Sequence, residues 1–188
     1  MSEHVPTYDE AQSILNEFIK SDSLLKHSYS VEGVMRYMAH KMGEDEEKWA
    51  IIGLVHDLDY EMFPEQHCEK AQEILRERSW PEEYVRAVAS HGWGICNDIE
   101  PRTNLEKVLY ASEELTGLIT AVAIIRPSKS VGDLEVKSVM KKWKDKSFAA
   151  GVNRSVIEKG AEILGVDLRQ LVDDVILGMR EVADRIGL

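Results

Sequence analysis

Apolar residues recur at intervals of three and four along almost the whole chain, and this spacing most strongly constrains the fold. The clearest case is the C-terminal segment 167–187. Its apolar positions are Leu168, Leu171, Val172, Val175, Ile176, Met179, Val182 and Ile186. This spacing is typical of an amphipathic helix that buries one face. Because the sequence contains no comparable alternating run of β-branched residues, it predicts an all-α fold.

Residues that favour helix ends divide the chain into nine predicted helices. Two capping-box patterns are present, Thr7 with Glu10 and Thr103 with Glu106. Further predicted N-caps are Asp45, Asn153 and Asp167, and predicted C-terminal glycines are Gly43 and Gly165. The predicted helices span 7–19, 23–42, 45–58, 67–78, 81–91, 103–125, 134–143, 153–164 and 167–187.

The length of 188 residues fits one compact domain. The stretch RPSKSVGD, residues 126–133, follows the long predicted helix and contains turn-forming residues. We therefore expect residues 1–126 to form a helical core. We expect residues 127–188 to form a C-terminal helical appendage that packs on this core within a single domain.

The chain is acidic, with 34 Asp and Glu residues against 23 Lys and Arg residues and a net charge of −11. This charge opposes non-specific binding to DNA or RNA, because a polyanion binds to a cationic surface. It does not exclude a small phosphorylated substrate, since a multivalent metal ion can invert the local field inside a cleft. Exposed helices are compatible with a homo-oligomer, although no sequence feature requires one.

Neither an export signal nor a membrane span is visible in the sequence. Ser2, Glu3 and His4 follow Met1 in place of a basic stretch and an apolar run, and no 18 consecutive apolar residues occur. Cys68 and Cys96 do not form a CxxC pair, so we expect no disulfide framework and a cytoplasmic protein. We also expect Cys68 to be a small core or surface residue and not a metal ligand.

Four of the six histidines lie at an end of a separate predicted helix: His27, His56, His67 and His91. Imidazole and carboxylate together suit iron, manganese, zinc, nickel or cobalt. The pair His56-Asp57 closes the apolar run 50–55, and a buried acid beside a buried imidazole needs partners. Gly53, one turn earlier, permits the close approach of another backbone or a metal ligand. His4 and His40 lie outside this pattern, and we expect both at the surface.

The order of these residues resembles that of the HD-domain superfamily of metal-dependent phosphohydrolases. His27 comes first, His56-Asp57 then ends the segment GLVHD, and an acidic residue follows in LYASEELTGLI, residues 109–119. The family usually has an Ala-Asp-x-Leu pattern here, which aligns its Asp with Glu113. The alternatives to Glu113 as a ligand are Glu114 or a water molecule. The resemblance implies an HD-domain helical bundle that carries the C-terminal helices.

The resemblance also implies a ligand set for one or two divalent transition metal ions. His67 and His91 stand where two-metal members of the superfamily carry histidines, so the binuclear form is the one we expect. Asp57 would bridge the metals, and Asp57 and His56 would be catalytic. The implied ligands are His27, His56 and Glu113 for one metal and His67 and His91 for the other.

The function that this resemblance implies is hydrolysis of a phosphate ester by metal-activated water. The implied substrate is a nucleotide or a related small phosphorylated molecule. We expect Arg126 and Lys129 to bind the substrate, the alternative being that they are surface charges. Tyr60 occupies the position of a lysine found in many relatives, which leaves the general acid unassigned. Two alternative functions are a di-iron oxygenase of the HD-domain type and a catalytically inactive regulatory module that binds a nucleotide.

Overall fold

The computed structural model describes residues 4–188, and within this range it contains helices, turns and no named β-strand. The all-α prediction is therefore confirmed. The α-helices are α1 (Tyr8–Phe18), α2 (Asp22–Met42), α3 (Glu46–Val55), α4 (Glu69–Glu77), α5 (Glu82–Ser90), α6 (Asn104–Ile124), α7 (Val136–Trp143), α8 (Arg154–Leu164), α9 (Leu168–Glu181) and α10 (Ala183–Ile186). One short 3₁₀ helix, η1 (Pro64–Gln66), precedes α4.

Most helices begin and end where local sequence signals predict. Both capping boxes form, because the Thr7 and Thr103 side chains each accept the amide N–H of the glutamate three residues later. The three further predicted N-caps also accept amide N–H groups of the first helical turn. Gly43 and Gly165 end α2 and α8 in the left-handed conformation, each with φ of 70°.

Two predicted boundaries are wrong. The helix predicted over 45–58 ends at Val55, so that His56 and Asp57 lie in the turns that follow. The helix predicted over 167–187 breaks at Val182 into α9 and α10. After this break, Arg185 reaches the buried Glu32 of α2 at 2.6 Å and lies over the Tyr29 ring. After the break, the C-terminal residues therefore contact α2.

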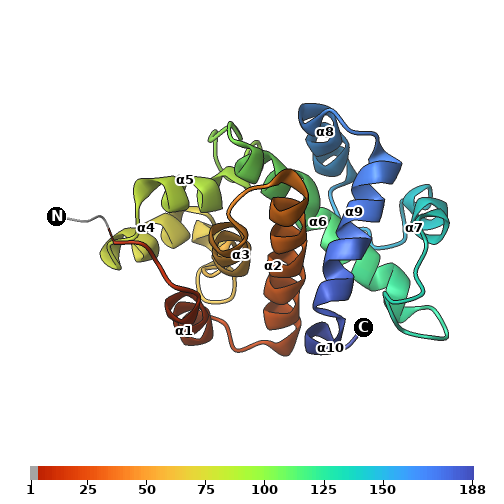
Figure 1. Cartoon of the computed structure of the whole chain (residues 1–188), viewed down its shortest axis with the longest axis horizontal. Helices are drawn as coiled ribbons and strands as arrows, with labels where there is room; N and C mark the ends of the chain where they lie inside the picture. Colours follow the sequence, from red (N-terminus) through yellow and green to blue (C-terminus); the bar gives the residue numbers. More distant parts are fainter. Residues whose placement is uncertain (1–3) are drawn as a thin grey trace.

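The two longest helices, α2 and α6, form the centre of the bundle (Figure 1). The short helix α3 packs along α2, and α4 and α5 pack against each other on the same side. On the other side, α9 runs antiparallel to α2, with ion pairs from Lys41 to Asp174 and from Arg185 to Glu32. The C-terminal helices therefore pack directly on the helices that carry the site.

Two glycines permit the closest helix contacts in this arrangement. A Cβ atom added at Gly178 of α9 would lie 2.6 Å from the Cα of Val34 in α2. A Cβ atom added at Gly160 of α8 would contact the backbone of Ala111 in α6 more closely still. The neighbouring atoms are backbone atoms, so they cannot move aside as a flexible side chain can.

Replacing Gly178 with Ala is expected to lower the free energy of unfolding by about 1–3 kcal/mol, because overpacking outweighs the gain in helix propensity. Gly117→Ala is the matched control. An added Cβ there, in the interior of α6, has its nearest neighbour at 3.8 Å. The control is expected to keep or increase stability. Urea unfolding measures both changes, and equal stability of the two variants would contradict the overpacking argument.

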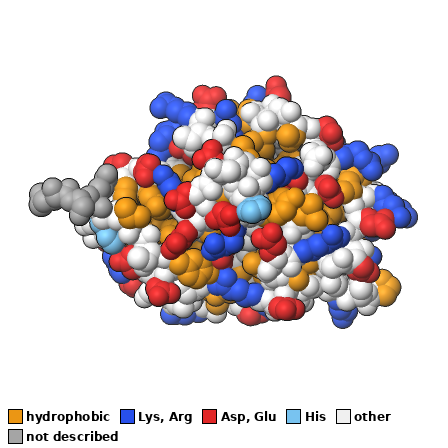
Figure 2. Space-filling model, in the orientation of Figure 1, with side chains coloured by type: hydrophobic (Ala, Val, Ile, Leu, Met, Phe, Trp, Pro, Cys, Tyr) orange, Lys and Arg blue, Asp and Glu red, His pale blue; other side chains and the backbone are white. Residues whose placement is uncertain are grey.

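Acidic and basic side chains are intermixed over the face shown in Figure 2. None of the helices within residues 4–188 combines the length and the apolar character that a membrane span requires.

Candidate metal centre

The structure brings all six predicted metal ligands into one cluster where α2, α3, α5 and α6 meet. Each comes from a different segment, except for the adjacent His56 and Asp57. The predicted ligands are His27 in α2, His56 and Asp57 after α3, His67 before α4, His91 at the end of α5, and Glu113 in α6. The helix bundle thus gathers residues that are up to 86 positions apart in the chain.

The helix α3 positions His56 and Asp57 because it is buried on almost all sides. Its residues from Trp49 to Val55 are all buried, and His56 is fully buried at its C-terminal end. Gly53 lets α2 approach, since a Cβ there would lie 3.1 Å from the Val31 carbonyl oxygen. The close backbone contact predicted at Gly53 is therefore confirmed, and it brings α2 toward His56.

Asp57 lies between two pairs of histidines. Its Oδ2 atom is 3.5 Å from the Nε2 of His27 and 3.4 Å from the Nε2 of His56. Its Oδ1 atom is 3.6 Å from the Nε2 of His67 and 3.2 Å from the Nε2 of His91. Asp57 therefore belongs to two groups of donor atoms, one with His27 and His56 and the other with His67 and His91.

Glu113 completes the first of these groups. Its Oε1 atom lies 3.4 Å from the Nε2 of His27, and both side chains are largely buried. The donor atoms of His27, His56, Asp57 and Glu113 all lie within 4.8 Å of one another. The Glu side chain, one methylene longer than the Asp usual in the family, thus reaches the cluster.

All four histidines are fixed through Nδ1, with Nε2 facing the cluster. The Nδ1 of His56 is 2.8 Å from the carbonyl oxygen of Gly53, and that of His91 is 2.5 Å from the carbonyl oxygen of Val88. A carbonyl only accepts a hydrogen bond, so Nδ1 is the donor in both rings. The remaining two contacts are His67 Nδ1 to Asp59 Oδ1 at 2.8 Å and His27 Nδ1 to Thr116 Oγ1 at 3.3 Å.

The donor set fits a transition metal ion. The Nε2 atoms of His27 and His56 are 3.2 Å apart, and those of His67 and His91 are 3.3 Å apart. Two imidazoles that donate through Nδ1 present lone pairs at Nε2, which repel unless a proton or a metal ion lies between them. Imidazole nitrogens with carboxylate oxygens are ligands that iron, manganese, zinc, nickel and cobalt accept. The cluster therefore has the chemistry of a metal centre.

The charges of the cluster shift the pKa values of its members. Burial lowers the pKa of His27, but hydrogen bonds to Asp57 and Glu113 and their negative charges outweigh it and raise this pKa to about 10. The same balance, with Asp57 as the main partner, raises the pKa of His91 to about 9. Burial raises the pKa of Asp57, but the surrounding histidines hold it well below its ordinary value. Without metal, the cluster therefore retains protons that a metal ion would displace.

The metal-free chain is expected to lose stability as the pH rises from about 6.5 to 10. The folded state holds the protons on His27 and His91 more tightly than the unfolded state, whose histidine pKa is about 6.5. The resulting stability is complete below that value and is lost as the pH passes about 9 and 10. Urea unfolding of chelator-treated protein measures this decrease, which should be smaller in His27→Gln. A free energy of unfolding that rises over this range would contradict the assignment.

Asp59 is a supporting residue that the sequence argument did not identify. It is fully buried, and its two oxygens are both used. Oδ1 accepts from His67, and Oδ2 accepts the amide N–H of Ala71 at 2.8 Å. A carboxylate that orients a ligating histidine also raises its basicity. The available signal was an acidic residue two positions after Asp57 in a mainly apolar segment.

Arg126 and Lys129 do not lie at the cluster. Arg126 follows the C-terminal end of α6 and forms an ion pair with Asp133 at 2.8 Å. With a helix rise of 1.5 Å per residue, thirteen residues place it roughly 20 Å along the helix from Glu113. Lys129 lies in the next turn with φ of 49°. The expected role of these residues in substrate binding therefore gains no support from their positions.

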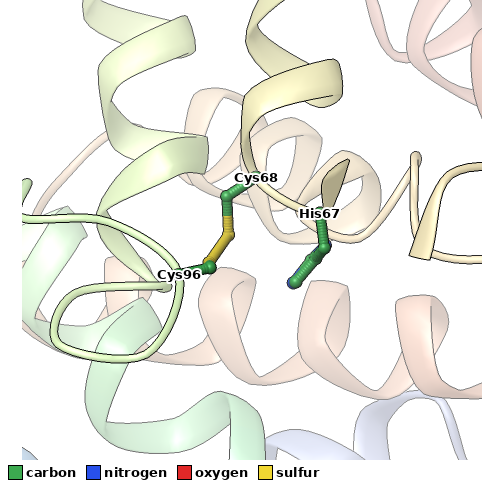
Figure 3. A group of neighbouring side chains, drawn as sticks. All are labelled: His67, Cys68 and Cys96. Atoms are coloured by element: carbon green, nitrogen blue, oxygen red, sulfur yellow. A yellow bond between two sulfur atoms is a disulfide. The ribbon is translucent and has the colours of Figure 1, made fainter. Parts of the chain in front are cut away.

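Cys68 and Cys96 form a disulfide, contrary to the expectation that the chain has no disulfide framework. Figure 3 shows this bond beside His67. The sequence separation of 28 gave no signal, because the packing of α4 on α5 is what brings the two Cα atoms to 6.6 Å. Cys68 is buried, which decides between the core and surface positions that the prediction left open. The cytoplasmic location stays a prediction.

A cavity of about 330 Å³ opens on the cluster. Four of the predicted ligands line it, together with other residues that include Tyr60, Ile95 and Glu114. Tyr60 packs edge-on against the His67 ring, with ring centroids 5.2 Å apart. Burial, with the charge of Glu113, raises the pKa of Glu114. No Lys or Arg of residues 4–188 lines this cavity, so neither residue type is available there to pair with a phosphate group.

Comparison with known protein families agrees with this geometry. The model of the HD domain family matches residues 24–118, a segment that begins in α2 and ends in α6 and contains all six residues of the cluster. A search of curated proteins finds no match to the chain. Because the family model covers half of the sequence, the chain belongs to the HD domain family, and its C-terminal helices are an addition to the matched segment.

Proposed function

We propose that this protein is a metal-dependent hydrolase of phosphate esters with a binuclear centre. The observation that carries the proposal is the position of Asp57, whose two oxygens face different pairs of histidines. A carboxylate shared in this way can bridge two metal ions. The family membership supports the same class of reaction, since HD domains are typically metal-dependent phosphohydrolases.

In this proposal each of the two groups of donor atoms around Asp57 holds one metal ion. His27, His56 and Glu113 would hold one metal ion, and His67 and His91 would hold the other. When bound, divalent transition metals supply Lewis acidity toward a phosphoryl oxygen and lower the pKa of water toward neutrality.

The side chains of the protein orient this centre and balance its charge. The Nδ1 contacts hold each imidazole so that Nε2 faces inward, which fixes the positions of the donor atoms before a substrate binds. Asp57 and Glu113 have low pKa values and remain anionic. The cavity of about 330 Å³ suits a phosphate group and a small part of the attached molecule.

Metal analysis combined with an activity panel tests the proposal. We expect about two metal ions per chain in the wild type and about one in His67→Ala and in His91→Ala. The control His40→Ala removes an exposed histidine outside the cluster and should keep two. Metal-loaded wild type should hydrolyse some members of a broad panel of phosphate esters. One metal ion per chain in all four proteins would overturn the binuclear assignment.

The test also separates hydrolysis from oxygen chemistry. Hydrolysis needs no redox change, so zinc or manganese should support it as well as iron does. Oxygen consumption that requires iron, together with no phosphatase activity in any metal form, would overturn the hydrolase proposal and favour a di-iron oxygenase. Loss of all activity with metal still bound would favour a regulatory module.

A further inference from the structure

A second cavity adjoins the metal centre between the end of α7 and the start of α8. Its volume is about 650 Å³. All of its walls come from residues 143–158, which lie outside the segment that matches the family. Its charged and aromatic lining residues are Trp143, Lys144, Lys146, Arg154 and Glu158. This cavity is therefore a feature of the C-terminal helices and not of the matched HD segment.

The lining is cationic although the chain as a whole is acidic. Three positive side chains face one carboxylate, that of Glu158, whereas the chain carries a net charge of −11. Some lysines near this region are paired, such as Lys137 with Glu135 and Lys159 with Glu162. Among the described residues, Lys144 and Lys146 have no ion pair. Their ammonium groups are thus available to an anion.

Arg154 is held in place without neutralisation of its charge. Its guanidinium group donates to the carbonyl oxygens of Trp143 at 3.1 Å, Asp145 at 3.1 Å and Phe148 at 2.7 Å. The Asp145 carboxylate is engaged elsewhere, with Ser147 and the amide of Phe148. Carbonyl groups fix the guanidinium but carry no net charge. Arg154 therefore adds a positive charge to the wall at a fixed position.

The cavity adjoins the metal centre at two points. Gly151 lines both this cavity and the one above the ligands. The amide N–H of Asn153, the N-cap of α8, donates to the Oε2 of Glu114 at 3.1 Å. Glu114 directly follows the ligand Glu113 and lines the cavity of the metal centre. A molecule bound at the metal centre can therefore extend into the cationic cavity.

We propose that this cavity binds a second anionic group of the substrate, a phosphate or a similar oxyanion, while the ester to be cleaved lies at the metal centre. The inference rests on the proposed hydrolase function for the role of the metal centre. Among the described residues, no Lys or Arg lines the smaller cavity, and its volume is limited, so the rest of a substrate must extend beyond it. The adjoining lysines, Arg154 and the N-terminal end of α8 favour an anion there. The substrate class is a phosphate ester with a separate second anionic group.

Calorimetric titration with inorganic pyrophosphate tests the cavity in the full chain with its metal bound. Lys144→Gln/Lys146→Gln is expected to weaken binding at least about tenfold, because two charge-assisted contacts are lost. The control Lys137→Gln/Lys159→Gln removes the same charge from exposed lysines elsewhere and should change the affinity less than about twofold. Pyrophosphate binding at the metal centre is common to all three proteins. Equal affinities of the two double variants would overturn the inference.

Kinetics then distinguish failure of this inference from failure of the proposed function. For an alkane bisphosphate, the KM of the Lys144→Gln/Lys146→Gln variant should be about tenfold higher than that of the wild type, with kcat unchanged. For the alkyl monophosphate of the same length, the KM should stay the same. Equal effects on both esters would contradict a second anionic group. If no ester is hydrolysed but the pyrophosphate difference persists, the anion site stands and the hydrolase function fails. If esters are hydrolysed and the two double variants bind equally, only the inference fails.

Discussion

Asp57→Asn is expected to lower phosphate ester hydrolysis on the order of a thousandfold, equivalent to about 4 kcal/mol of transition-state stabilisation. The two oxygens of Asp57 contact both pairs of histidines, at distances of 3.2 to 3.6 Å. The amide has one acceptor oxygen and no charge, so it cannot serve both groups of donors. Metal content should fall below one per chain, because the substitution affects both groups. Elemental analysis and steady-state kinetics measure the two effects.

Asp98→Asn is the control for this substitution, because Asp98 is exposed in the loop after α5 and outside both donor groups. It should keep the metal content and activity of the wild type. The buried position of Asp57 makes misfolding a possible cause of lost activity, so circular dichroism and thermal unfolding accompany the measurements. A folded Asp57→Asn protein that retains two metal ions and wild-type activity would refute the bridging role.

Asp59→Asn is expected to weaken the binding of one of the two metal ions about 10–100-fold and to reduce activity by a similar factor. One Asp59 oxygen accepts from Nδ1 of His67, and the other accepts the amide N–H of Ala71. Asn offers a single acceptor, and its NH₂ group would face a donor in one of these two contacts. The His67 ring would then lose its fixed orientation, and the more distant His27 would not.

The measurement for Asp59→Asn is the metal affinity of each site in a competition titration with a chelator. The expected effect is selective: the affinity for one metal ion falls, and the affinity for the other is retained. His67→Ala provides the comparison, since it removes the ligand that Asp59 supports. Asp98→Asn again controls for the loss of a carboxylate. Two metal ions with wild-type affinities would show that Asp59 has no part in orienting His67, and equal weakening of both would point to a general loss of structure.

Much of the fold could be predicted from the sequence because the signals are local. Capping boxes act over three residues, and the amphipathic spacing of α9 repeats within two turns. The predictions failed where tertiary contacts override the local pattern. Apolar spacing continues past Val182, yet the chain turns there, and Arg185 joins Glu32 of α2. A periodic pattern carries no information about such a distant partner.

The candidate site could be predicted in part for a similar reason. The six predicted ligands follow an order along the chain that resembles a known family, and the structure brings these residues together. Asp59 was missed because its role depends on the position of His67 and on the amide of Ala71, both set by packing. Arg126 and Lys129 follow the helix of Glu113 in the sequence, but the length of α6 carries them away from the ligands.

The sequence by itself thus determined the helical class, most helix ends and the set of candidate metal ligands, since these depend on residue type and spacing. Only the tertiary structure decided how the donor atoms divide around Asp57, that Cys68 meets Cys96, and that a cationic cavity adjoins the centre. These features join residues that are far apart in the chain. Their distances depend on how helices pack against one another, and packing is set by the shape and burial of many side chains together.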